Sequence, residues 1–289
     1  MTTQDIKAKD LTTKAMLVAL NIKQWNVNRK DKQATAKLAE DFQSVTGWAR
    51  GNKSLASKKA LSEVNGIVAE CRQFHMLNTC PWTDEGYRIL PSKNYMFYTD
   101  KLREFTARFE VAVQNIKANY PAIIEEAKQS LGTLFNELDY PAISDLDSKY
   151  AVNVSVSPLP SSNDFRVTQI SDEDIKAIQE QIENRLNEAT KGIMADLWSR
   201  LYTVVEKAFE AFSDPDMKFH DSKLDNIQET IEILRRLNID NDLKLERMCK
   251  VTEARICSLD PAELRKQPEA RQDAAIDAKK LLESLAAFN

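Results

Sequence analysis

The clearest hydrophobic pattern in the chain is a run of apolar or small residues between Ile175 and Phe212. They recur every three or four positions, with a mean of about 3.7, which is near the period of a straight α-helix. Ser171 is a suitable N-cap, and three acidic residues follow it in the first turn. At about 1.5 Å per residue this helix would be about 60 Å long, so an elongated molecule is predicted.

Shorter stretches with the same spacing predict further helices. Asp31 opens one that extends to about Gln43, and Gly47 is expected to end it. Pro121 is expected to break or kink a long helix, after which another continues to about Leu138. The other predicted helices cover 54–78, 98–120, 224–237, 241–258, a short segment from 261, and the region after 268.

Two segments instead alternate between apolar and polar residues, which is typical of strands. Residues 16–25 alternate after an apolar start, and residues 151–168 resemble a hairpin with a long loop from Pro158 to Asp164. The predicted fold class is therefore mainly α: an elongated bundle of long helices with a small antiparallel β-sheet, made of strand 16–25 and hairpin 151–168. We expect a single elongated domain over 1–289, with a possible division between a basic part, 1–149, and an acidic helical part, 150–289.

The charge of the chain is unevenly distributed, although its net value is only −4. Residues 1–120 contain 19 Lys and Arg against 12 Asp and Glu, whereas residues 121–289 contain 21 against 32. The basic part is either a binding surface or a partner for the acidic part of the same chain.

The four cysteines form no Cys-x-x-Cys pair, and no basic-then-apolar leader opens the sequence. Free thiols in a reducing compartment, and hence a cytoplasmic protein, are expected. The longest apolar run, Ala15 to Leu20, is far shorter than the about 20 residues that a spanning helix needs, so no membrane association is expected.

No nucleotide-binding glycine motif, nucleophile elbow or zinc-protease motif is present, and there are only six glycines. We therefore expect no enzymatic activity, no cofactor and no small-molecule substrate. Cys71, His75 and Cys80, completed by Cys249 or Cys257, have a spacing that zinc could use, but buried structural roles are favoured.

A second candidate for a metal site lies around His220 and Asp221, which stand near Asp214, Asp216 and Asp225. The same residues are typical of a helix boundary with a capping residue. The capping interpretation is favoured, so no metal ligand is predicted here either.

Basic and aromatic residues are interleaved between positions 23 and 59. This combination suits single-stranded nucleic acid, because positive charge binds phosphates and aromatic rings stack on bases. The alternative is that both tryptophans are core anchors and the basic side chains only solvate the surface. The candidate nucleic-acid residues are Trp25, Arg29, Lys30, Lys32, Trp48, Arg50 and Lys53, with Lys23, Lys58 and Lys59 beside them.

Four local features together resemble a known family. They are the strand ending at Trp25 with Asp31-Lys32 after it, the Pro81-Trp82 to Leu90-Pro91 loop, Asp139-Tyr140-Pro141, and Val156 to Pro160 followed by Phe165-Arg166. Their order and spacing, over about residues 10–260, resemble a family of phage and prophage proteins whose domain has no assigned function.

The resemblance implies a phage-borne protein of the host cytoplasm, often encoded near a MoxR-type ATPase and a protein with a von Willebrand A domain. An adaptor or client of a remodelling ATPase would fit that context. We therefore expect a non-enzymatic protein–protein interaction or assembly module that binds a protein partner or itself, with single-strand nucleic-acid binding through 23–59 as the alternative.

Overall fold

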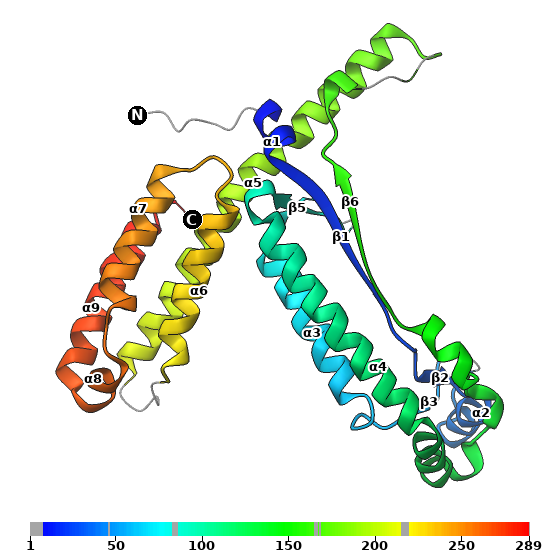
Figure 1. Cartoon of the computed structure of the whole chain (residues 1–289). Helices are drawn as coiled ribbons and strands as arrows, with labels where there is room; N and C mark the ends of the chain where they lie inside the picture. Colours follow the sequence, from blue (N-terminus) through cyan, green and yellow to red (C-terminus); the bar gives the residue numbers. More distant parts are fainter. Residues whose placement is uncertain are drawn as a thin grey trace. The chain divides into compact units, whose positions relative to one another are not determined.

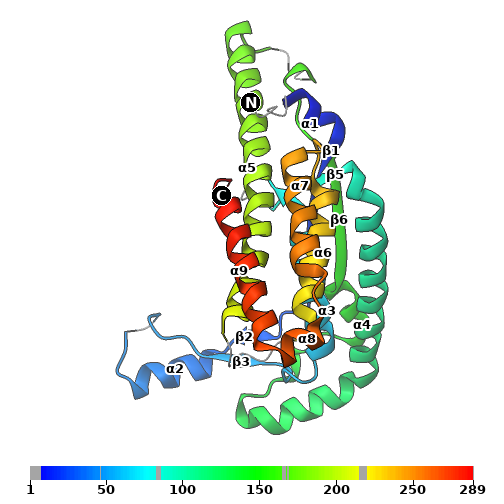
Figure 2. The ribbon, with the colours of Figure 1, turned by 90° about the vertical axis from the view of Figure 1, so that its left-hand side faces the viewer.

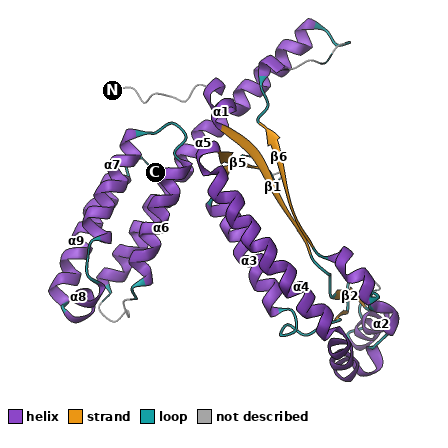
Figure 3. Ribbon diagram, viewed as in Figure 1, coloured by secondary structure: helices purple, strands orange, loops and turns teal. Residues whose placement is uncertain are grey.

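A computed structural model describes residues 8–45, 47–82, 86–164, 167, 169–214 and 220–288. Long helices dominate it, and its strands form a small antiparallel sheet and a separate two-stranded ribbon (Figure 1, Figure 3). The predicted fold class, mainly α with a small antiparallel sheet, is therefore confirmed.

The chain forms two compact units, and each of them is discontinuous in sequence. Unit 1 comprises residues 1–19, 76–98 and 155–289, and unit 2 comprises residues 20–75 and 99–154. Unit 2 contains 16 Lys and Arg against 14 Asp and Glu, and unit 1 contains 24 against 30. The charge difference between the units, +2 against −6, is smaller than the difference between the sequence halves.

The helices of unit 1 assemble around α5, the 42-residue helix Asp172–Ser213. Helices α6 and α9 both pack against it (Figure 2). The other helices are α1 (Ala8–Lys14), α6 (Ser222–Leu237), α7 (Leu243–Thr252), α8 (Pro261–Lys266) and α9 (Pro268–Leu285), and Glu253–Cys257 continues α7 as a π-helical turn.

The sequence pattern explains α5 well. The Ser171 hydroxyl accepts a hydrogen bond from the Asp174 amide, as expected of an N-cap. Residues at the predicted helical spacing, including Leu186, Ile193 and Leu201, are buried in the core of unit 1. The predicted long helix is thus confirmed, and its stability comes from burying one face against α6 and α9.

The four-stranded sheet has the order β4-β5-β1-β6. Strand β1 pairs antiparallel with β5, with Ala15 opposite Pro91 and Val18 opposite Arg88. The strands are β1 (Ala15–Lys23), β4 (Cys80–Pro81), β5 (Arg88–Pro91) and β6 (Ala151–Pro158).

Two features of this sheet differ from the sequence predictions. The segment 80–91, predicted as a loop, supplies two short strands, because residues at either end of the loop pair with each other. The predicted hairpin 151–168 was wrong in its described part: Ala151–Pro158 is a strand beside β1, and Ser162–Asp164 forms a 3-10 turn. Phe165, Arg166 and Thr168 lie outside the described residues.

Unit 2 contains helices and a short ribbon around its own core of aromatic and aliphatic residues. Its helices are α2 (Lys32–Asp41), α3 (Ser62–Leu77) and α4 (Tyr95–Leu131), which begins in unit 1. Its ribbon pairs β2 (Asn28–Lys30) with β3 (Asn52–Ser54), and 3-10 turns follow α4 at Gly132–Leu134, Glu137–Asp139 and Ile143–Lys149.

One predicted helix boundary in unit 2 is wrong, and the structure decides between the two alternatives at Pro121, a break or a kink. Helix α3 begins at Ser62 and not at 54, because Asn52–Ser54 pairs with β2. Pro121 does not end α4, which continues to Leu131 and bends in its C-terminal part (Figure 2). Tyr120 and Ile123 on either side of the proline are buried, and this packing compensates for the backbone hydrogen bond that proline cannot donate.

A truncation in α5 tests the contribution of the unit 1 core. The Leu201 side chain is fully buried, so Leu201→Ala should lower the free energy of unfolding by about 2–5 kcal/mol. Thr203→Ala, on the exposed face of the same helix, should change it by less than about 0.5 kcal/mol. Chemical denaturation monitored by circular dichroism measures both, and equal effects would contradict the described packing of α5.

Candidate functional site

Three large hydrophobic side chains are exposed close together after α2. Phe42 is 76% exposed, Val45 73% and Trp48 87%. We call these three residues the apolar tip. Figure 2 shows α2 and the segment after it projecting from the β2–β3 ribbon. Single exposed hydrophobic residues are ordinary, but a group of three on one short segment is typical of an interaction site.

The backbone at the end of α2 is held by a Schellman-type pair of hydrogen bonds. The Ser44 amide donates to the Ala39 carbonyl at 2.9 Å, and the Gln43 amide donates to the Glu40 carbonyl at 3.1 Å. Gln43 takes the left-handed conformation, φ 48°, that this motif requires. The helix end therefore fixes the backbone of Phe42, although the ring itself has little packing.

The second half of the tip is also ordered by the backbone. The Trp48 amide donates to the Val45 carbonyl at 3.2 Å, and Gly47 has φ 97°, a conformation that glycine adopts without strain. Val45 and Trp48 are thus presented on a turn. The exposed rings sit on a defined backbone.

The base of the α2 segment is closed by hydrogen bonds around Gly51. The Asp31 amide donates to the Gly51 carbonyl, and the Gly51 amide donates to the Thr35 hydroxyl, both at 3.0 Å. The Asp31 carboxylate caps α2 by accepting from the Ala34 amide at 2.9 Å. A Cβ on Gly51 would lie 2.7 Å from the Ala34 Cβ, so only glycine allows this approach.

Lys53 connects this base to the segment after α4. Its ammonium group lies 2.8 Å from the Asp31 carboxylate, 2.8 Å from the Asp139 carboxylate and 2.7 Å from the Leu134 carbonyl. Its side chain is only 6% exposed. The hydrogen bond from Lys53 holds the pKa of Asp31 below its ordinary value, and the two carboxylates raise the pKa of Lys53.

Trp25 also stabilises this region from inside unit 2. It is 8% exposed and makes edge-on contacts with Tyr120, at 5.7 Å between ring centroids, and with Tyr140, at 6.4 Å. The Tyr120 hydroxyl donates to the Pro141 carbonyl at 2.9 Å, and burial raises the pKa of Tyr120 to about 12. Trp25 is therefore a core anchor.

The predicted nucleic-acid residues are thus divided by the structure. Trp25 and Lys53 are buried, so neither can stack on a base or contact a phosphate. Their prediction as nucleic-acid residues was therefore wrong. Arg29 pairs with Asp139 at 3.2 Å. Lys23, Lys30, Lys32, Trp48, Arg50, Lys58 and Lys59 are exposed.

Phe42 and Val45 were missed by sequence reasoning. They follow the last turn of α2 and are too few to establish a helical or strand pattern, and a short hydrophobic group of this kind is equally typical of a buried loop. The sequence does contain one signal for this group: Phe42, Val45 and Trp48 follow one another at intervals of three residues, directly after the acidic pair Glu40-Asp41.

The candidate metal residues are distributed as follows. Cys71 and His75 are buried in unit 2, whereas Cys80 and Cys249 belong to the core of unit 1. Burial raises the pKa of Cys71 to about 11, which makes its thiol a poor nucleophile at neutral pH. No group of three or more His, Cys, Asp or Glu in the described part of the chain is arranged to hold a metal ion.

The structure describes the His220-Asp221 candidate only in part, because Asp216 lies outside the described residues. Asp221 stands at the start of α6, but its side chain does not cap the helix as predicted. It pairs instead with Arg265.

None of the helices that the structure describes has the length and apolar character to cross a membrane. Comparison of the chain with protein-family models, curated proteins and solved structures finds no match.

The carboxylate of Asp31 gives the α2 region a testable pH dependence. Because the pKa of Asp31 is lowered below 3.8 on folding, its contribution to stability is present above that value and is lost as the pH falls through the folded pKa. The midpoint of thermal unfolding should therefore decrease from pH 6 to pH 3, and Asp31→Asn should reduce this decrease. Asp41→Asn, an exposed position on the same helix, is the control. Identical pH profiles for wild type and Asp31→Asn would contradict the Lys53 interaction.

Proposed function

We propose that this chain is a non-enzymatic protein–protein interaction or assembly module that docks a protein through the apolar tip. The observation that supports the proposal is the exposure of Phe42, Val45 and Trp48 on a segment whose base is fixed by Lys53 and Gly51. An exposed apolar group on a rigid base is what a preformed interaction site requires.

The energetics favour a protein as the occupant of the tip. Full burial of a large apolar side chain contributes about 1.5–3 kcal/mol, and aromatic residues dominate the energy of protein interfaces. The backbone bonds at Gln43, Ser44 and Trp48 reduce the ordering cost on binding. The resemblance to phage proteins encoded near a MoxR-type ATPase extends the proposal to an adaptor for a remodelling ATPase.

Binding of single-stranded nucleic acid remains the second candidate, supported by one observation. Trp48 is exposed next to Arg50, and Lys30 and Lys32 are exposed at the other end of the same segment. A ring and basic side chains in this order suit base stacking and phosphate contact. The carboxylates of Glu40 and Asp41 lie within the same segment and weaken this interpretation, because they repel phosphates.

A photo-cross-linking residue placed at position 48 tests the protein-docking proposal in the native cells. We expect a discrete cross-linked species, identified by mass spectrometry, that disappears when Phe42→Ala is added. Trp48→Ala itself should change the free energy of unfolding by less than about 0.5 kcal/mol, since its ring has little packing. The matched control is a cross-linker at Val111, a 60% exposed hydrophobic residue of α4; the same species at both positions would contradict docking at the tip.

Fluorescence anisotropy of labelled oligonucleotides across a salt titration separates the two functions. We expect no binding that depends on the tip, because the acidic pair next to Phe42 opposes phosphate. Binding that weakens linearly with the logarithm of salt concentration, and is lost in both Trp48→Ala and Arg50→Ala, would replace the protein proposal by the nucleic-acid one.

A further inference from the structure

Unit 1 contains an apolar groove between α5, α8 and α9. The groove has a volume of about 540 Å³, within the range of about 300–1,000 Å³ typical of sites that bind ligand-sized groups. Phe212 is buried at its floor, whereas Ile276 is 47% exposed along its wall. The other apolar lining residues are Phe209, Leu264, Pro268 and Ala275.

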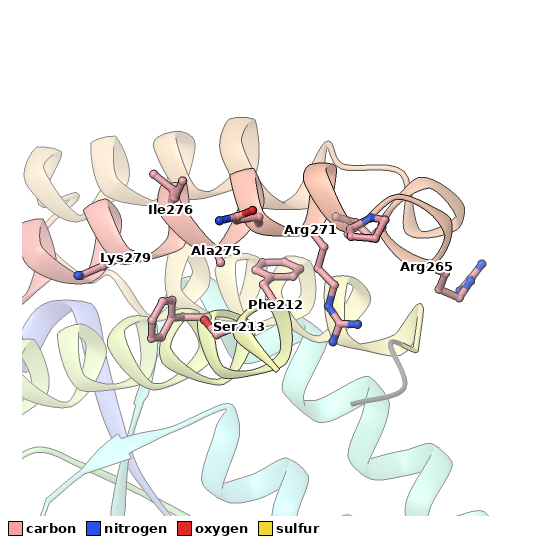
Figure 4. A pocket seen from close by; sticks show the side chains of 11 residues that line it. Phe212, Ser213, Arg265, Arg271, Ala275, Ile276 and Lys279 are labelled. Carbon is pink, nitrogen blue, oxygen red and sulfur yellow. The ribbon is translucent and has the colours of Figure 1, made fainter. Parts of the chain in front are cut away.

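The charged residues that line this groove are all basic: Arg265, Arg271 and Lys279. Figure 4 shows Lys279 and Arg265 at opposite ends, with Phe212 and Ala275 between them. Arg271 donates to the carbonyls of Ala211 and Asp214, which holds it at the end of α5.

The two basic ends of the groove differ in their interactions. Arg265 already pairs with Asp221. Lys279 is exposed on α9, and the structure gives it no ion pair with any described carboxylate. An occupant of the groove therefore needs large apolar groups for the floor and carboxylates for the Lys279 end.

The α2 segment of unit 2 has this composition. Glu40 and Asp41 are exposed in the last turn of α2, and Phe42, Val45 and Trp48 follow at intervals of three residues. Apolar rings next to two carboxylates complement an apolar floor next to basic side chains. The chain thus carries both an apolar segment next to acidic residues and an apolar groove next to basic residues, and the two are complementary.

We propose that the apolar tip of one copy occupies the α5–α8–α9 groove of a second copy, with Glu40 or Asp41 near Lys279. This inference rests on the proposed function, since it names the partner of the tip as the chain itself. The contact is heterologous, because it joins the tip of one copy to the groove of another. Such contacts generate rings or open chains.

Sedimentation velocity across a concentration series tests the self-association. The wild type should associate increasingly up to about 100 μM, a range that detects micromolar dissociation constants. Trp48→Ala and Ile276→Lys should each weaken the association at least tenfold, and both positions are exposed enough for the variants to fold. Val111→Ala is the matched control, because it alters an exposed hydrophobic residue outside both surfaces.

Mixing the two variants gives a sharper result. Trp48→Ala retains a groove and Ile276→Lys retains a tip, so the mixture should form one-to-one pairs that do not grow further. Charge reversal provides a second criterion: Lys279→Glu should weaken association, and Asp41→Lys in the same chain should restore it.

Three outcomes would overturn the inference: a monomer at every concentration, association that survives both Trp48→Ala and Ile276→Lys, or no recovery in the mixture. If the chain is monomeric but position 48 cross-links a different protein, only the self-association is wrong and the docking function stands. If position 48 cross-links nothing, the proposed function is wrong as well.

Discussion

The buried ammonium group of Lys53 is the interaction on which the α2 segment depends. It lies between Asp31, which caps α2, and Asp139, which follows α4, and it also donates to the Leu134 carbonyl. A lysine this deeply buried is stable only when its charge is compensated. The three partners compensate it and, because they come from both ends of unit 2's sequence, they also tie the beginning of α2 to the turns after α4. Asp31 then aligns Gly51 and Thr35, and the segment between them emerges at a defined place.

This arrangement separates the part of the segment that is stabilised from the part that is exposed. The base consists of a buried ion pair, a close glycine contact and an N-cap, whereas the rings of Phe42 and Trp48 remain in water. Removing the tip should therefore cost little stability, and removing the base should displace the tip. A site with this division can be tuned for its partner without loss of the fold, because its interaction energy comes from side chains that the core does not use.

The sequence predicts this fold best where one physical effect dominates. In α5, the cap Ser171, an acidic first turn and one apolar face from Ile175 to Phe212 all indicate one long helix, and the structure shows it as Asp172–Ser213. Prediction fails where contacts between residues distant in sequence determine the secondary structure. Ser54 is predicted to begin a helix but pairs with β2, and buried neighbours maintain the helix that Pro121 could have broken. For the candidate site, composition singled out residues 23–59, which include part of the apolar tip, but could not show which of their side chains are exposed. Trp25 and Lys53 are buried by Tyr120, Tyr140 and Asp139, residues about 80 or more positions away.

The motif Asp139-Tyr140-Pro141 has a structural explanation in unit 2. The Asp139 carboxylate binds Lys53, the Tyr140 ring packs on Trp25, and the Pro141 carbonyl accepts a hydrogen bond from the Tyr120 hydroxyl. All three interactions stabilise the base of the α2 segment. The motif therefore explains how the apolar tip is held in place and says nothing of what the tip binds. The specificity of binding has to come from local charge instead. Unit 1 is negative overall, yet its groove is lined by Arg265, Arg271 and Lys279. Since salt screens exposed charges beyond about 8–10 Å at physiological ionic strength, an incoming Glu40-Asp41 pair responds to the groove rather than to the net charge of the unit.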